Sequence, residues 1–302
     1  MKKIGIGIFL FAILCGALQA QVTVEVTADQ EQFLPGEDLP VAVRITNRTG
    51  RTLRLGASDD WLTFSIEGQD GPSDIVSRTG DVPVAGEFDL ESSKVAIKRV
   101  NLAPYFSLNK QGRYGVIATL HIPNAGAVEI VSNPKLFYVV EGARIWEREF
   151  GIPAADGGAS EIRKYVLQQS SQAKGQLRLY LRVTDASGSK TLKIFPIGTL
   201  LSFSRPNPQL DRDSNLHLLF QSGPTTFSYT VFNPNGDLVI RQTHDFLNNS
   251  RPRLLSDAEG NIRVKGGMRR ESLKDFPPKI EAAATESVKP AATPDETSNQ
   301  KP

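Results

Sequence analysis

The regular alternation of apolar and polar residues limits this chain to a fold built from β-strands. Residues 22–28 (VTVEVTA) and 39–46 (LPVAVRIT) place an apolar side chain at every second position. This period of two is typical of a strand with one face buried and the other in water. Because no long helical period interrupts it, the sequence predicts an all-β protein with antiparallel sheets.

Turn residues separate these segments at short intervals. In residues 33–37 (FLPGE), Pro35 fixes φ and Gly36 supplies flexibility, and residues 47–50 (NRTG) form a predicted hairpin turn. Leu62, Phe64 and Ile66 are expected to face the same way. Further strands are predicted at residues 51–55, 95–102, 112–122 and 135–140. Strands of this length, joined by Gly, Pro and Asn turns, indicate an antiparallel sandwich over residues 21–142.

Three stretches of that region resemble the immunoglobulin-like domains of secreted bacterial proteins. They are FLPGEDLPVAVRITNRTG, LAPYFSLNKQGRYGVIATL and VSNPKLFYVV. In those domains a Pro-Gly-Glu turn precedes the second strand, a Gly-x-Tyr opens a late strand, and Ser-Asn precedes the last. The resemblance implies a two-sheet sandwich and brings no catalytic residues. Tyr114 of the Gly-x-Tyr is expected to pack at a sheet corner, with its hydroxyl bonded to the backbone.

The remaining chain is predicted to form a linker at residues 143–160 and a second β domain at 161–266. Residues 161–172 (EIRKYVLQQSSQ) fit a strand or a short helix, and we favour the strand because its surroundings are β. Residues 208–220 can be aligned with 252–264, which gives an irregular repeat with prolines 44 residues apart. The repeat resembles β-propeller blades. It supplies only two or three blades, so we predict a separate meander or small sandwich rather than a ring completed by several chains.

One polar cluster in this domain has the composition of a reactive site. The stretch RPNPQLDRDSNLHLLFQ (residues 205–221) holds two carboxylates, arginine, serine and histidine. Aspartate and asparagine also suit turns, because their side chains bond nearby N–H groups and tolerate left-handed geometry. A calcium loop starting at Asp211 would need Gly and Glu where the chain has Leu216 and Ser222. We therefore interpret residues 211–215 as a turn before a strand, rather than a metal or catalytic site.

The histidine of that cluster is expected on the face of the sheet opposite its apolar neighbours. His217 alternates with Leu216 and Leu218, which predicts that it lies on the more polar face. When the Asn that starts each strand is matched, Asn215 with Asn261, His217 corresponds to Arg263, and arginine is not a metal ligand. The sequence thus predicts no metal ligands here.

No sequence motif of an enzyme is present. The three histidines, His121, His217 and His244, are scattered and fall in no paired-ligand spacing. The nucleophile elbow, the phosphate-binding loop and the dinucleotide fingerprint are absent. We predict no catalytic, cofactor-binding or metal residues. A pair of glycosidase carboxylates brought together only by folding is the remaining route to catalysis.

The first twenty residues, MKKIGIGIFLFAILCGALQA, predict export from the cytoplasm. Two lysines, an apolar run and small residues up to Ala20 are typical of a secretory signal peptide. The expected location is periplasmic or secreted, with no stable membrane span. Cys15, the only cysteine, could mark a lipoprotein, but Leu14 is a poor residue before a lipidated cysteine. Residues 267–302 are predicted to be a disordered tail.

The balanced net charge argues against nucleic acid and anionic membranes as partners. Residues 21–302 hold 33 Lys and Arg against 33 Asp and Glu, so no net field attracts nucleic acid or an anionic membrane.

The hypothesis that fits best is an exported, non-catalytic binding or scaffolding protein, with an envelope protein or a glycan as partner. Exposed aromatics would be the natural contacts, and the candidates are Trp61, Tyr105 and Phe106. A protease inhibitor acting through the long segment 67–89 is a second hypothesis. A carbohydrate-active enzyme built on the second domain is a third. The sequence does not fix an oligomeric state.

Overall fold

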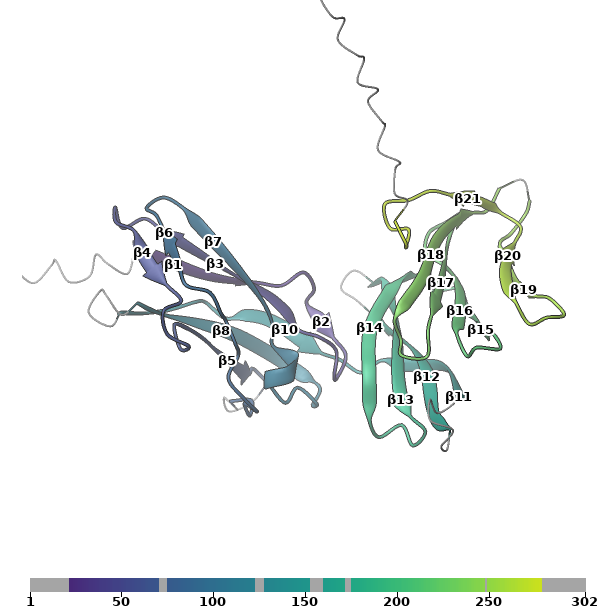
Figure 1. Cartoon of the computed structure of the whole chain (residues 1–302), viewed down its shortest axis with the longest axis horizontal. Helices are drawn as coiled ribbons and strands as arrows, with labels where there is room; N and C mark the ends of the chain where they lie inside the picture. The colour runs from purple at the N-terminus through teal and green to yellow at the C-terminus, as the bar shows by residue number, and fades with distance from the viewer. Residues whose placement is uncertain are drawn as a thin grey trace, which may run out of the picture.

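The computed structural model describes residues 22–70, 75–122, 128–152, 160–171, 175–247 and 249–278. Within them the chain is almost entirely β, which confirms the predicted fold class, and it forms two domains that lie end to end (Figure 1). The predicted signal peptide and residues 279–302 of the predicted tail lie outside the described residues.

The first domain is a sandwich of two main sheets. Its strands pair antiparallel except β2 and β10, which run parallel. One sheet has the order β1 (Val22–Thr27), β3 (Pro40–Asn47), β7 (Val95–Asn101). The other has the order β2 (Gln32–Phe33), β10 (Lys135–Val139), β8 (Gly112–Ile122), β5 (Leu62–Gly68), with β9 (Val128–Val131) also on β8. A small ribbon joins β4 (Leu53–Leu55) to β6 (Phe88–Leu90), and the short 3-10 helix η1 spans Ala103–Tyr105.

The predicted alternation determines which side chains form the core of this sandwich. In β1 every second residue is buried and the others are exposed. Leu62, Phe64 and Ile66 of β5 are buried together, as predicted, and meet Val43 and Ile45 of β3 in one apolar cluster. Burial of such side chains is the main stabilising contribution to a small sandwich.

Tyr114 closes a corner of the sandwich as predicted. Its hydroxyl donates to the carbonyl oxygen of Lys110 at 2.8 Å, four residues upstream, and its ring stacks on Phe137 at a centroid distance of 5.6 Å. Hydroxyl-to-backbone bonding of this kind is a recurring feature of immunoglobulin-type sandwiches.

The second domain consists of three β layers. The first sheet contains β11 (Ala143–Ile152), β12 (Glu161–Ser171), β13 (Leu177–Asp185) and β14 (Thr191–Leu200), in chain order. The second, here called the central sheet, contains β15 (Asn207–Leu210), β16 (Leu216–Gln221), β17 (Thr226–Phe232), β18 (Leu238–Asp245) and β21 (Met268–Arg270). The third layer is the hairpin of β19 (Arg253–Ser256) and β20 (Ile262–Lys265).

The structure extends the domain boundaries that the sequence predicts. Residues 161–171 form a strand, as favoured, but the predicted linker at 143–160 contains β11, which pairs with β12 along nearly its whole length. β11 is an edge strand, and most of its side chains are exposed and many are charged. Its composition is therefore like that of a linker, which explains why the sequence predicts one. At the other end, β21 lies within the predicted tail and pairs with β18.

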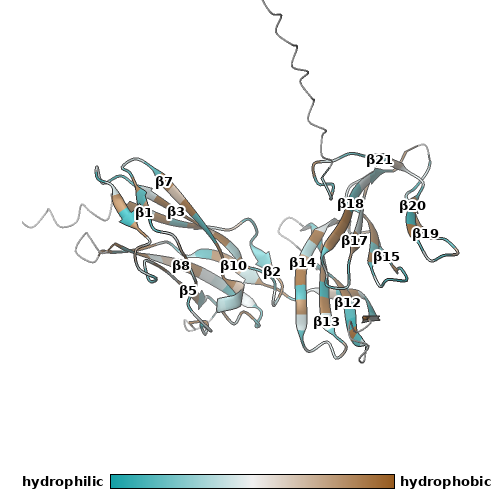
Figure 2. Ribbon diagram, viewed as in Figure 1, coloured by the Kyte–Doolittle hydropathy of each residue, from teal (hydrophilic) through white to brown (hydrophobic). Residues whose placement is uncertain are grey.

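The central sheet is covered on both faces. One apolar cluster joins it to the first sheet, through residues such as Leu181 and Leu218, and a second joins it to the hairpin, through Tyr229 and Leu254. Hydrophobic residues accordingly occur in β13, in β17 and in the first half of β18 (Figure 2). All six residues of β16 are buried. His217 lies on the face opposite Leu216 and Leu218, as the alternation predicts, but the hairpin covers that face and His217 is buried.

The two domains meet at the predicted turn of residues 33–37. Leu34 packs with Tyr180 and Ile194 of the second domain, and all three side chains are buried. Arg182 donates to the carbonyl oxygen of Pro35 at 3.1 Å, and Arg178 donates to the side chain of Gln30.

Glu37 organises this turn from inside the junction. It is 5% exposed and accepts hydrogen bonds from the Leu34 N–H at 2.8 Å and the Gln30 amide at 2.7 Å. Burial raises the pKa of Glu37, although these two bonds and the nearby Arg178 act in the opposite direction. Ionisation of Glu37 therefore weakens the folded junction as the pH rises above the carboxyl group's ordinary value of 4.5.

We expect Gly142→Val to loosen the junction. A Cβ at this position would lie 3.0 Å from Leu34 Cδ1 and 3.2 Å from Gln168 Cβ, so a larger side chain overpacks the contact. Overpacking should cost about 1–3 kcal/mol of unfolding free energy, measured by urea titration with circular dichroism. Gly151→Val in β11, which begins directly after Gly142, is the control, because a Cβ there has no atom within 4 Å. Equal stability of the two variants would contradict this account of the junction.

Candidate functional site

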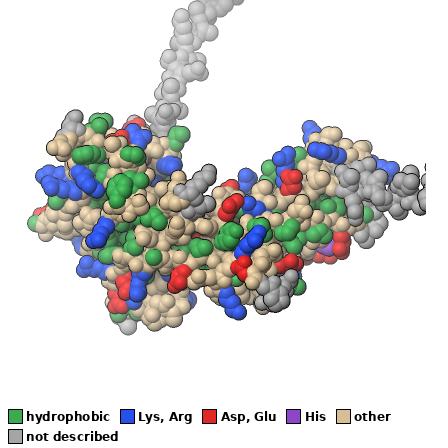
Figure 3. All heavy atoms as spheres, turned by 180° about the vertical axis from the view of Figure 1, so that it is seen from behind, with side chains coloured by type: hydrophobic (Ala, Val, Ile, Leu, Met, Phe, Trp, Pro, Cys, Tyr) green, Lys and Arg blue, Asp and Glu red, His purple; other side chains and the backbone are tan. Residues whose placement is uncertain are grey.

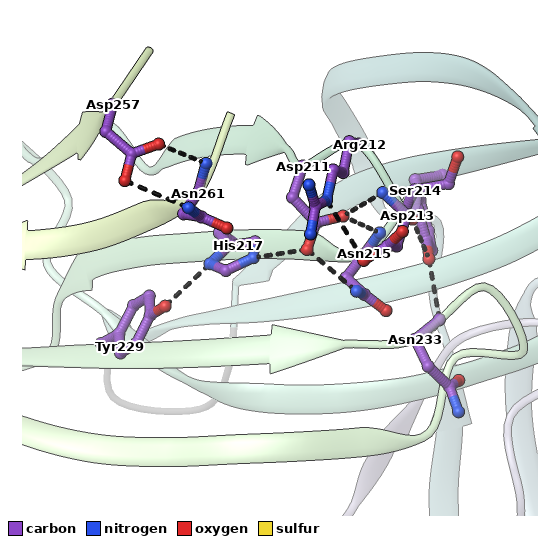
Figure 4. Close-up of polar contacts among 11 residues, drawn as sticks. Asp211, Arg212, Asp213, Ser214, Asn215, His217, Tyr229, Asn233, Asp257 and Asn261 are labelled. Carbon is purple, nitrogen blue, oxygen red and sulfur yellow. Dashed lines mark hydrogen bonds and ion pairs between the residues drawn. The ribbon is translucent and has the colours of Figure 1, made fainter. Parts of the chain in front are cut away.

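The polar cluster of residues 211–215 forms the turn between β15 and β16. Asp211 Oδ1 accepts the backbone N–H groups of Asp213 at 2.9 Å and Asn215 at 2.8 Å, and Oδ2 accepts the Asn215 side-chain amide at 2.9 Å (Figure 4). Ser214 has a φ of 62°, in the left-handed region. The cluster is thus a turn held by one carboxylate, as the sequence predicts.

The same five-residue turn occurs twice more in this domain. Residues 233–237 and 257–261 repeat the bonds of the first residue to the fifth, with Gly236 and Gly260 in the left-handed position. The structure therefore aligns Asp211 with Asp257. This alignment is shifted by two residues from the one that matches Pro208 with Pro252. The proline-based alignment places Asp213 opposite Asp257 and misses the shared turn.

A buried hydrogen-bonded chain extends from this turn into the central sheet. His217 Nε2 lies 3.1 Å from Asp211 Oδ2, and His217 Nδ1 lies 2.7 Å from the Tyr229 hydroxyl. A carboxylate only accepts hydrogen bonds, so Nε2 donates to Asp211. In the neutral imidazole, Nδ1 then accepts from the tyrosine. The order of groups is that of a catalytic relay.

The burial and hydrogen bonding of Asp211, His217 and Tyr229 nevertheless fit a structural role for these residues. Burial would raise the pKa of Asp211, but the bonds from Asn215 and His217 outweigh it and lower the pKa overall. Burial, helped by the nearby Asp211 charge, raises the pKa of Tyr229 to about 12. A proton donor and acceptor suited to neutral pH would have values close to 7. The side chains of His217 and Asp211 are only 9% and 14% exposed, so a substrate has little access to them.

His244 lies on the other side of Tyr229. Its ring meets the tyrosine edge-on at 6.4 Å, and its buried Nε2 has no hydrogen-bond partner among the described residues. Burial and the charge of Arg269 lower the pKa of His244. Sequence spacing hides this grouping, because His217, Tyr229 and His244 are adjacent only after β16, β17 and β18 pair. His121 lies in the first domain, 3.4 Å from Glu129.

The aromatic candidates lie within or against the core of the first domain. Trp61 is 1% exposed and Phe106 is 5% exposed, which leaves almost no ring surface for a ligand. Trp61 Nε1 donates to the Val84 carbonyl at 2.7 Å, and Tyr105 is half-buried against the same core.

The segment proposed as an inhibitory loop is attached to the domain over its second half. Val82 and Val84 are buried in the sandwich core, and the Thr79 N–H donates to the Tyr105 carbonyl at 3.0 Å. Residues 71–74 lie outside the described residues.

A groove of about 660 Å³ opens between the central sheet and the hairpin β19–β20. We call it the basic groove. Its lining residues are Ser204, Arg205, Asn207, Leu219, Phe220, Gln221, Phe227, Asn249, Ser250, Arg251, Pro252, Arg253, Lys265 and Gly266. They include three arginines and a lysine, and none is Asp, Glu or His. Figure 3 shows Lys and Arg side chains at the end of the second domain remote from the first.

The cations of the basic groove are not neutralised by the protein. In the described part of the chain, Arg205, Arg251, Arg253 and Lys265 form no ion pair; the Arg251 guanidinium lies 5.2 Å from the Phe227 ring centroid and 3.5 Å from Gln221 Oε1. In a second hollow, beside the junction, Arg144 pairs with Glu147 at 2.8 Å and Lys164 with Glu149 at 3.4 Å.

The wall of the groove is held by two glycines. Gly266 and Gly267 have φ values of 81° and 66°, and a Cβ on Gly266 would lie 2.6 Å from the Arg251 carbonyl oxygen. The Gly267 N–H donates to Ser250 Oγ at 3.1 Å. This close contact requires glycine and fixes the loop that carries Arg251 against the end of the hairpin.

The balanced net charge conceals a difference between the domains. Residues 22–142 hold 11 Lys and Arg against 16 Asp and Glu, a formal charge of −5. Residues 143–278 hold 19 against 13, a formal charge of +6. The second domain therefore has a positive field that the whole-chain total does not show.

Comparisons with known proteins give little further information. No family model matches the chain, and no curated protein matches it significantly. Among solved structures, the sporulation control protein Spo0M from Bacillus subtilis matches with a TM-score of 0.31 and 10% sequence identity. That match covers 67% of this chain and 79% of the other. Similarity at this level carries no argument about function.

The described residues contain no helix with the length and apolar character needed to cross a membrane. They also contain no group of three or more His, Cys, Asp or Glu side chains placed to hold a metal ion.

We expect Asp211→Ala to destabilise the second domain by about 1–3 kcal/mol at neutral pH, because the partly buried N–H groups of Asn215 and His217 lose a charged acceptor. The folded pKa of Asp211 is below its ordinary value of 3.8, so its ionised form stabilises the fold above that pH. The difference from wild type should shrink as the pH falls below 3.8 through the folded pKa. Urea titrations across this pH range measure it.

Asp213→Ala is the matched control in the same turn. The Asp213 carboxylate is 74% exposed, and its removal should change stability by no more than about 0.5 kcal/mol. Equal losses in the two variants would show that Asp211 does not hold the turn.

Proposed function

We propose that this protein is an exported, non-catalytic binding protein that holds an anionic ligand in the basic groove of its second domain. The observation that carries the proposal is a groove lined by four cations that have no ion-pair partner among the described residues. Unpaired guanidinium groups next to one another repel, and a ligand with carboxylate or phosphate oxygens relieves this repulsion. Arginine suits such ligands because its planar fork binds two oxygens at once.

The chemistry of the groove supports binding rather than turnover. Its described lining offers no carboxylate or imidazole to act as a general acid or base. The carboxylates near the outer edge of the central sheet are paired with arginines. Asp245 lies 2.7 Å from Arg270, and Asp275 lies 3.0 Å from Arg269. A carbohydrate-active enzyme would instead need two available carboxylates across a cleft.

In this proposal the first domain is an immunoglobulin-like module that carries the binding domain. Its two-sheet sandwich and the bonding of Tyr114 support membership of that family. The module is acidic and the binding domain basic, so an anionic ligand is attracted to the second domain. The signal-like residues 1–20 support a periplasmic or secreted location. A role of segment 67–89 in protease inhibition has less support, because residues 79–84 are bonded to the domain core.

The double variant Arg251→Glu/Arg253→Glu should weaken binding of an anionic probe by at least about tenfold, because attraction in the groove becomes repulsion. The measurement is biolayer interferometry of residues 21–302 against immobilised dextran sulfate, with neutral dextran as the reference surface.

The double variant Arg148→Glu/Arg212→Glu carries the same change of net charge outside the groove and is the control. Both of its positions lie in the second domain and neither lines the groove. The proposal fails if wild-type protein does not bind dextran sulfate, or if the two double variants lose affinity equally.

A further inference from the structure

The strands beside the basic groove are poorly suited to bind a peptide as an additional strand. β15 is the outer strand of the central sheet, and it contains Pro208 and follows Pro206. On the opposite wall, Pro252 immediately precedes β19. Proline has no N–H to donate to a neighbouring strand, and it protects sheet edges from pairing. An acidic peptide would therefore lack the main-chain bonds that give such complexes their affinity.

The polar lining of the groove suits hydroxyl groups. Asn207 and Ser204 contribute an amide and a hydroxyl beside Arg205. Such groups donate and accept at the same time, as sugar hydroxyls do. Gln221 has a different role, because its amide donates to the Pro224 carbonyl at 2.8 Å and its Oε1 faces Arg251.

An exposed aromatic residue is adjacent in sequence to the lining of the groove. Phe203 is 79% exposed, and the residues that follow it, Ser204 and Arg205, line the groove. A ring exposed next to these residues offers an apolar face to a ligand bound in the groove. The flat apolar face of a sugar ring fits such a side chain, while the cations bind carboxylates on the same ligand.

Size and rigidity are consistent with a short chain of sugars. The volume of about 660 Å³ lies within the range of small-molecule sites. The contact of Gly266 and Gly267 with residues 250–252 fixes the cation-bearing loop before binding, which reduces the entropy lost on association.

We propose that the ligand of the basic groove is an acidic glycan, a short oligosaccharide whose sugar units carry carboxylates. The inference rests on the proposed function, since it assigns a ligand class to that same site. The arginines bind the carboxylates, the amide and hydroxyl side chains bind the sugar hydroxyls, and Phe203 stacks on a terminal ring.

Isothermal titration calorimetry of residues 21–302 with four probes tests the inference. The probes are tetragalacturonate, the neutral galactotetraose, hexaglutamate and inorganic tripolyphosphate. We expect tetragalacturonate to bind at least about tenfold more tightly than each of the other three. Galactotetraose lacks the charges, hexaglutamate lacks the ring hydroxyls, and tripolyphosphate lacks a ring to stack.

Two single variants separate stacking from charge. Phe203→Ala should weaken tetragalacturonate binding by about threefold to tenfold and leave tripolyphosphate binding unchanged. Leu273→Ala, which removes a fully exposed apolar side chain outside the groove, should change neither.

The outcomes distinguish the inference from the proposed function. If hexaglutamate or tripolyphosphate binds as tightly as tetragalacturonate, the groove is an anion site but the glycan assignment is wrong. If Phe203→Ala has no effect on tetragalacturonate, the assignment is also overturned. If no anionic probe binds, both the glycan assignment and the proposed function fail.

Discussion

The second domain depends on one constraint, the burial of the central sheet on both of its faces. The first sheet covers one face and the hairpin β19–β20 covers the other, so β16 has no exposed residue. A polar side chain in such a strand must find a partner inside the protein, since an unpaired buried polar group is costly. His217 does so through Asp211 and Tyr229. The hydrogen bonds from Asp211 through His217 to Tyr229, which resemble a catalytic relay, are thus explained by the burial of both faces of the central sheet.

The repeated five-residue turn connects these layers. Each copy begins with Asp or Asn, whose side chain binds the N–H of the fifth residue, and the fourth residue is left-handed. Tyr165 of the first sheet donates to the carbonyl of Asn233 at 2.7 Å, and its hydroxyl also lies 3.2 Å from the backbone carbonyl oxygen of Ser214. Two of the turns are therefore anchored by one buried tyrosine, which fixes the central sheet on the first. The polar residues of these turns are committed to the fold, and the open basic groove is left as the place for a ligand.

Much of the fold was predictable because a half-buried strand has a simple period. The alternation along β1, β3 and β5, the turn at residues 33–37, the corner at Tyr114 and the turn at 211–215 were all inferred from local sequence. The edge strands β11 and β21 were not, because most of their side chains are exposed. The mostly exposed β11 has the composition of a linker, and β21 lies in a charged stretch. The groove was missed for a related reason. Its cations come from three separate segments, and their field cancels against the acidic first domain in the whole-chain total.

The sequence by itself determined that this is a β protein with turns at fixed places, since periodicity and turn chemistry act between neighbouring residues. The tertiary structure alone decided which faces are buried, because the second face of the central sheet is covered by a hairpin some forty residues further along the chain. It also decided that Arg205, Arg251, Arg253 and Lys265 share one groove, while Trp61 and Phe106 are buried in the core. Contacts between distant segments depend on how the β layers pack, and the periodicity of neighbouring residues does not predict that packing.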